Sequence, residues 1–100
     1  MRTTLWTARL KPGRMAETLA AAKPHIEASR AEPGCLAFDF YANVDGSDTL
    51  VTVEQYVDQA ALDAHRQTPH SRAFMPILAA NIESFRMDWL APPDDDNPVP

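Results

Sequence analysis

The chain has 100 residues, 45% hydrophobic and 23% charged, as in an ordinary soluble globular protein of one domain. Its formal net charge of −5 argues against nucleic acid and membrane surfaces as partners, because both attract clustered lysine and arginine, and no apolar run reaches the roughly 20 residues of a membrane-spanning helix. The first ten residues show no secretory signal and the single cysteine, Cys35, cannot form an internal disulfide, so we expect a cytoplasmic location.

A change of hydrophobic period predicts a first strand followed by a first helix. Alternate positions of the strand share one face: Thr4, Trp6, Ala8 and Leu10. After a Lys-Pro-Gly break, apolar or small residues recur at helical spacing: Met15, Leu19, Ala22, Ile26 and Ser29. This pattern predicts a helix over 15–31. Pro24 lies inside it, so we expect a kink or break near Ala22, with one bent helix favoured over two.

An abrupt corner follows the first helix. Pro33 cannot continue a helix, and we expect Gly34 to take the positive φ of a helix end. The next segment alternates again and predicts a second strand with one face formed by Leu36, Phe38, Phe40 and Ala42. Turn-forming residues fill 43–48 and β-branched residues fill 49–56, which together indicate a hairpin.

The second half of the chain predicts two helices and a last strand. Asp58 is a candidate N-cap for a helix that ends before Thr68-Pro69. A further helix begins near His70 and is expected to direct four apolar side chains to the core: Phe74, Ile77, Leu78 and Ile82. The last strand is marked by the alternation of Phe85, Met87 and Trp89. We therefore predict a domain over 1–90 and an acidic, proline-rich, flexible tail over 91–100.

The element order predicts an α+β fold, a ferredoxin-like split β-α-β domain with an antiparallel four-stranded sheet. Helices would cover one face of this sheet. Alternating residues of the second and fourth strands would leave apolar surface on the other face, where burial is favoured by about 25 cal/mol per Å². We therefore expect a homodimer that packs sheet against sheet.

Three motifs in this order resemble the antibiotic biosynthesis monooxygenase family, which includes small quinol and anthrone monooxygenases. The resemblance spans Thr4 to Trp89. The motifs are Glu32-Pro33-Gly34-Cys35-Leu36, then Glu54-Gln55-Tyr56, then Ala61-Leu62-Asp63-Ala64-His65 running into Thr68-Pro69-His70. Each motif is weak alone, and their order and spacing together are more specific.

The resemblance implies a dimeric α/β barrel with a mostly apolar pocket between helices and sheet. It also implies oxygenation without flavin, haem or metal. Such chemistry requires a substrate that, once deprotonated, can itself give an electron to O₂, while the protein supplies a proton acceptor, a dry cavity and orientation.

His65, Glu54 and His70 are the candidate catalytic residues. An imidazole with a pKa near 6.5 can accept a phenolic proton around neutrality, which makes His65 the proposed base, although it could simply pack at a helix end. Glu54 could orient His65 or bind the substrate hydroxyl, and it could equally hold a dimer contact. His70 could form a pocket wall with Phe74, or lie at the surface at a helix start.

Four further residues are candidate substrate ligands. Trp6, Tyr56 and Phe74 supply rings for a planar aromatic guest, and most of the chain's rings would otherwise be core. Asn43 could bond a substrate oxygen, or could be present for its turn conformation. The spacing of the three histidines matches no metal motif, so no metal site is expected.

The resemblance, together with these candidate residues, implies a cofactor-independent monooxygenase that oxidises a quinol-like or polycyclic phenolic small molecule with O₂. Two other classes stay open. One is a non-catalytic dimeric ligand-binding or stress-associated module, which would bind aromatic ligands without turnover. The other is an isomerase or lyase that acts on a small oxo compound, which would work without oxygen.

Overall fold

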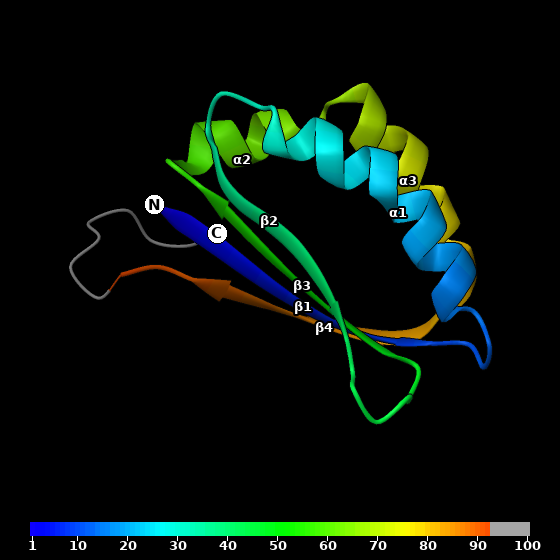
Figure 1. Ribbon diagram of the computed structural model, residues 1–100. Helices are drawn as coiled ribbons and strands as arrows, with labels where there is room; N and C mark the ends of the chain where they lie inside the picture. The colour runs from blue at the N-terminus through cyan, green and yellow to red at the C-terminus, as the bar shows by residue number, and fades with distance from the viewer. Residues whose placement is uncertain (93–100) are drawn as a thin grey trace.

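The computed structural model describes residues 1–92 and has one layer of helices on one layer of sheet (Figure 1). The elements alternate as the sequence predicts. In chain order they are β1 (Arg2–Leu10), α1 (Met15–Arg30), β2 (Cys35–Ala42), β3 (Thr49–Tyr56), α2 (Gln59–Arg66), α3 (Pro69–Asn81) and β4 (Ile82–Leu90).

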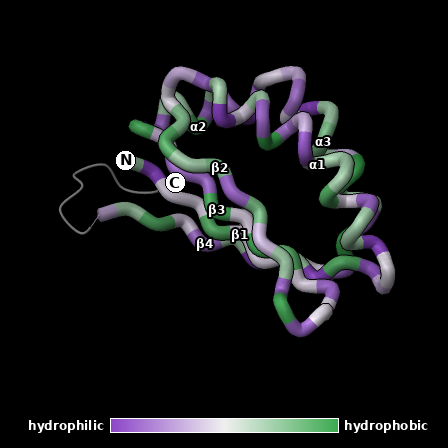
Figure 2. The backbone as a smooth tube through the Cα atoms, viewed as in Figure 1, coloured by the Kyte–Doolittle hydropathy of each residue, from purple (hydrophilic) through white to green (hydrophobic). Residues whose placement is uncertain are grey.

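The four strands form one antiparallel sheet in the order β2-β3-β1-β4. The first strand therefore lies in the middle, paired with β3 on one side and β4 on the other. Leu5 pairs with Val53 of β3 and Asp88 of β4. This is the predicted α+β fold of split β-α-β type, and hydrophobic residues occur in both layers (Figure 2).

Helix α1 continues through Pro24, so the chain is not divided there. The corner that follows α1 forms as predicted, but the predicted reason for its glycine is wrong. Positive φ angles occur at Gly13 and Gly46, not at Gly34. Instead, a Cβ at Gly34 would lie 2.5 Å from Cβ of Ala61 in α2. Glycine is needed here because the corner packs directly against the second helix.

Side-chain caps begin the two later helices. The carboxylate of Asp58 accepts a hydrogen bond of 2.8 Å from the backbone N–H of Ala61, as expected of the predicted N-cap. Thr68 Oγ1 accepts one of 3.3 Å from the N–H of Ser71 at the start of α3. Pro69 occupies the first turn of α3, where its missing N–H leaves no helical bond unmade.

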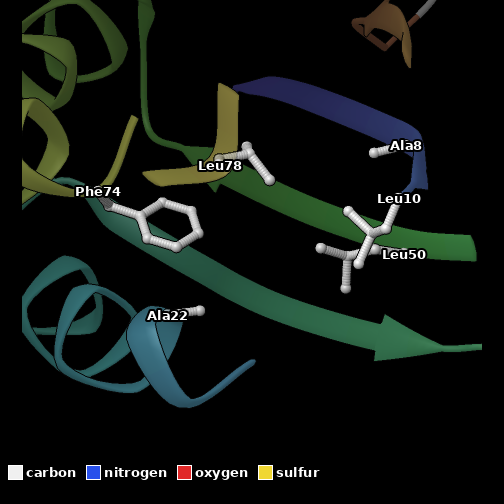
Figure 3. Packing of buried hydrophobic residues seen from close by; sticks show 6 residues of the cluster. All are labelled: Ala8, Leu10, Ala22, Leu50, Phe74 and Leu78. Atoms are coloured by element: carbon white, nitrogen blue, oxygen red, sulfur yellow. The ribbon is translucent and has the colours of Figure 1, made fainter. Parts of the chain in front are cut away.

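The main core lies between the sheet and helices α1 and α3. It contains six buried hydrophobic residues that converge from both layers (Figure 3): Ala8, Leu10, Ala22, Leu50, Phe74 and Leu78. A second buried cluster contains Phe38, Tyr56 and Leu62, nearer to α2. The helical layer is therefore held along its whole length.

Three apolar side chains are exposed, and one of them, Ile77, was predicted to face the core. Leu36 is 55% exposed. The pairing of β2 with β3 shifts between Cys35 and Ala37, so Leu36 is an extra residue without a partner in β3 and does not follow the alternation of the strand. Ile77 is 42% exposed, on the outer side of α3. Phe85 is 56% exposed, because β4 is an edge strand, and stacks on Trp6 at a centroid distance of 5.1 Å.

The sheet face opposite the helices is apolar mainly along its two central strands. Leu5, Val51 and Val53 lie there, all partly exposed. On the same face β4 presents Arg86 and Asp88, so this strand does not supply the apolar surface expected of it. The predicted tail over 91–100 lies, from residue 93 onward, outside the described residues.

Candidate functional site

A cavity of about 170 Å³ lies between the sheet and the helices. Its walls are mostly apolar or aromatic and come from three strands and all three helices. They are formed by Thr4, Trp6, Ala8, His25, Phe38, Phe40, Leu50, Thr52, Glu54, His65, Arg66, Ser71, Phe74, Met75 and Leu78. Polar groups are few, as in typical small-molecule sites.

The polar and apolar walls lie at different ends of the cavity. Thr4 pairs with Glu54 across the sheet, and Ala8 pairs with Leu50 four residues along. We call Glu54, His65, Arg66 and Ser71 the polar end. We call Ala8, Leu50, Phe74 and Leu78 the apolar end, and all four belong to the main core.

His65 is the centre of the polar end, with a partner at each ring nitrogen. Its Nδ1 lies 2.8 Å from Oε2 of Glu32. Its Nε2 lies 3.3 Å from Oγ of Ser71 and 3.4 Å from Oε1 of Glu54. An ionised carboxylate can only accept at Nδ1. Glu32 therefore favours the tautomer with the proton on Nδ1 and a lone pair on Nε2, the nitrogen beside Ser71 and Glu54.

Local structure explains how Glu32 reaches His65 although 33 residues separate them. Glu32 lies in the corner between α1 and β2, and the close approach of Gly34 to Ala61 holds this corner against the helix that carries His65. The same oxygen of Glu32 lies 2.6 Å from Nε2 of His70 at the start of α3. One carboxylate therefore joins the corner to both later helices.

Burial sets the charge states at the polar end. Removal from water lowers the pKa of His65, and the hydrogen bond to Glu32 opposes this change. Burial raises the pKa of Glu54 to about 7, with the nearby Arg66 acting in the opposite direction. A proton acceptor and a carboxyl group that can carry a proton near neutrality thus lie side by side.

His25 is a buried histidine of the cavity wall that the sequence patterns did not single out. It is 5% exposed and stacks on Phe74 at a centroid distance of 4.8 Å. Burial, together with His65 and His70, lowers its pKa to about 4, so the ring is neutral at pH 7. Its Nδ1 has no hydrogen-bond partner within residues 1–92.

Four of the seven candidate site residues line the cavity: Trp6, Glu54, His65 and Phe74. His70 reaches the site through Glu32, and the Tyr56 ring contacts the His65 ring at 5.2 Å. Asn43 lies at the far end of β2, where its side-chain amide donates to Oγ of Ser47 at 3.1 Å, and it is not among the cavity walls.

Sequence reasoning assigned no role to Glu32, although the residue begins one of the three quoted motifs. Ser71, which contacts His65, was missed in the same way. The only signal in the sequence was the position of Glu32 next to a helix-ending Pro-Gly pair, which does not reveal its partners.

Residues 1–76 match the family described as antibiotic biosynthesis monooxygenase. The match covers most of the chain, including the corner and both later helix starts. The chain belongs to this family.

Relatives and solved structures agree with this membership. "Uncharacterized protein sll1783" of Synechocystis is 36% identical over 83% of this chain, which spans only 58% of that protein. "Putative monooxygenase YcnE" of Bacillus subtilis is 33% identical, and the match covers 80% of this chain and 88% of the length of YcnE. A phosphonooxypentane-dione isomerase of Klebsiella pneumoniae is 34% identical, and the match covers 70% of this chain and 71% of the length of the isomerase.

The fold also matches the solved structure of Rv0793 from Mycobacterium tuberculosis. The TM-score is 0.83 and the sequence identity is 28%, over 96% of this chain and 98% of that one. Within residues 1–92, none of the helices has the length and apolarity needed to cross a membrane.

Proposed function

We propose that the chain is a cofactor-independent monooxygenase that oxidises a quinol-like or phenolic small molecule with O₂. The observation that carries the proposal is the contact of 2.8 Å between Glu32 Oε2 and His65 Nδ1 at the wall of a mainly apolar cavity, which favours a proton acceptor at Nε2. His65 accepts the phenolic proton, and the electron-rich phenolate then gives an electron to O₂. Family membership and a relative named as a monooxygenase support the same reaction class.

The size of the cavity favours a single ring over a polycyclic substrate. An apolar cavity of about 150 Å³ is enough for a benzene molecule, and this cavity measures about 170 Å³. Trp6, Phe40 and Phe74 supply flat walls for such a ring. A polycyclic phenol would have to extend beyond the cavity.

The proton-transfer groups also support a second candidate, isomerisation of a small oxo compound. Oε1 of Glu54 lies 3.4 Å from Nε2 of His65. The raised pKa of Glu54 lets its carboxyl group donate a proton near neutrality while His65 accepts one. A relative named as an isomerase of a phosphorylated dione is 34% identical to this chain. This reaction consumes no oxygen.

Sheet-to-sheet dimerisation stays part of the proposal. Leu5, Val51 and Val53 form an apolar strip along the two central strands, on the face without helices. A second copy would bury this strip. Sedimentation velocity that shows only a monomer at micromolar concentration would contradict the dimer.

The test measures O₂ uptake by metal-stripped protein with a panel of single-ring hydroquinones, in parallel with product analysis under anaerobic conditions. We expect O₂-dependent turnover that His65→Ala abolishes and that Val44→Ala, an exposed change in the hairpin turn, leaves intact. Product formed without oxygen would support the isomerase instead. Binding of the panel without turnover would support a ligand-binding module.

A further inference from the structure

We propose that Glu32, His65 and His70 form a binding site for one divalent transition-metal ion of the Zn²⁺, Co²⁺ and Ni²⁺ class. One ligand atom from each residue lies within 4.8 Å of the other two. Oε2 of Glu32 is 2.8 Å from Nδ1 of His65 and 2.6 Å from Nε2 of His70. No metal spacing is visible along the sequence, because the three residues come from three different segments.

The types of ligand in this cluster suit these ions. Two imidazoles and one carboxylate are preferred by divalent zinc, cobalt and nickel. Two ligand atoms bound at about 2.0–2.1 Å with a tetrahedral angle lie about 3.3 Å apart. The two distances from Glu32 Oε2 to the histidine nitrogens are shorter than this separation and would lengthen by several tenths of an ångström. The separation of the two histidine nitrogens is within 4.8 Å and would shorten to about 3.3 Å. Rotation of the Glu32 and His70 side chains is therefore required to admit the ion.

The other ring nitrogen of His65 already has the environment that a metal-bound histidine requires. Histidine ligands usually donate their second N–H to a carboxylate or another acceptor, which fixes the ring. Nε2 of His65 lies 3.4 Å from Oε1 of Glu54 and 3.3 Å from Oγ of Ser71. A neutral His65 can thus move its proton from Nδ1 to Nε2, donate it to Glu54, and offer Nδ1 to the metal.

The site is held by the fold and is open on one side. The side chains of His65 and Glu32 are 7% and 13% exposed, whereas that of His70 is 21% exposed. The ligands are positioned by the corner and by α2 and α3, whose starts are capped by Asp58 and Thr68. His70 is the most exposed of the three ligands, so solvent reaches the cluster at this residue.

Metal binding would oppose the proposed oxygenation. With Nδ1 on the metal, Nε2 carries the proton and can no longer act as the base. This consequence depends on the proposed function, whereas binding itself does not. Metal binding is therefore measured without substrate, so that the failure of one proposal does not decide the other.

The experiment titrates untagged, metal-stripped protein with Zn²⁺ by calorimetry and with Co²⁺ by visible absorption. We expect one ion per chain with micromolar affinity. Affinity should fall about tenfold or more in His70→Asn and Glu32→Gln. His25→Asn is the matched control, because the His25 ring lies 5.6 Å from both His65 and His70 but supplies no ligand.

Three results would overturn the metal site. They are no binding by the wild type, binding that persists in both ligand variants, and equal loss in the His25 control. Circular dichroism and thermal melts of the metal-free variants check that each one folds. If His70→Asn does not fold, Glu32→Gln together with anomalous scattering from a Co²⁺-soaked crystal decides the question: density between Glu32 and His65 supports the site, and its absence overturns it.

Discussion

The two ends of the cavity differ in what holds them and therefore in what a change there should do. The apolar end is part of the main core, so its side chains support the fold and shape the cavity together. The polar end is held by hydrogen bonds between a corner and two helix segments. We expect changes at the polar end to act mainly on chemistry and changes at the apolar end mainly on stability.

The sharpest test of this division is His65→Ala. If His65 is the base, turnover should fall by about 10²–10⁴-fold, the usual contribution of general base catalysis. Measurement of kcat and KM by O₂ uptake checks this, with KM little changed because the apolar end is intact. Full activity in the variant would remove His65 from the mechanism.

Phe74→Ala probes the apolar end. Phe74 is 3% exposed and packs between His25 and Phe40, so its truncation leaves a hole that the core cannot fill. The free energy of unfolding should fall by about 3–5 kcal/mol, as measured by urea denaturation. Phe74→Leu is the control, with a smaller loss. A loss of activity without a loss of stability would contradict the division.

Glu54→Gln tests the charge state of the polar end. The folded pKa of about 7 lies above the ordinary value of 4.5, so folding takes up a proton between these pH values and the contribution of Glu54 to stability disappears as pH rises. The variant should therefore gain stability relative to the wild type at pH 8 but not at pH 4, by at most about 3 kcal/mol.

Paired denaturation curves of wild type and Glu54→Gln at both pH values provide the measurement. The comparison must be made within each pH, because His25 acts in the opposite direction. Its pKa of about 4 lies below 6.5, so its contribution to stability is lost as pH falls. A stability difference that is the same at pH 4 and pH 8 would contradict the buried, protonated carboxyl group.

Asp58→Ala has the smallest expected effect. It removes the cap of the helix that carries His65, which should lower the free energy of unfolding by about 1 kcal/mol. Asp58→Asn, which keeps an acceptor oxygen, should restore most of the loss. A loss of activity much larger than that of stability would show that the cap positions His65.

The fold was predictable because its elements follow simple periods. Alternation grouped Trp6 with Ala8 and Phe38 with Phe40, and the structure places all four in the cavity wall. Asp58 marked a helix start correctly. Leu36 was misplaced because a shift in strand pairing depends on the partner strand and not on local alternation. Long, regular elements are thus set locally, whereas irregular positions depend on the packed structure.

The candidate site was predictable only in part. His65, Glu54 and Phe74 stood out by residue type and family motif, and the structure brings them together around one cavity. Glu32 did not, because its role arises from contacts with residues 33 and 38 positions later. Such contacts are made by tertiary packing and leave no period in the sequence.

Gly34 shows how closely the polar end is tied to the rest of the chain. Its backbone lies so close to Ala61, four residues before His65, that there is no room for a Cβ atom at position 34. A methyl group at position 34 would have to push α2 outward, and the imidazole would move away from the carboxylate two residues before the glycine. The close approach of Gly34 to Ala61 therefore sets the distance between the Glu32 carboxylate and the His65 imidazole. Neither Gly34 nor Ala61 belongs to the cavity walls, so this control lies outside the substrate cavity.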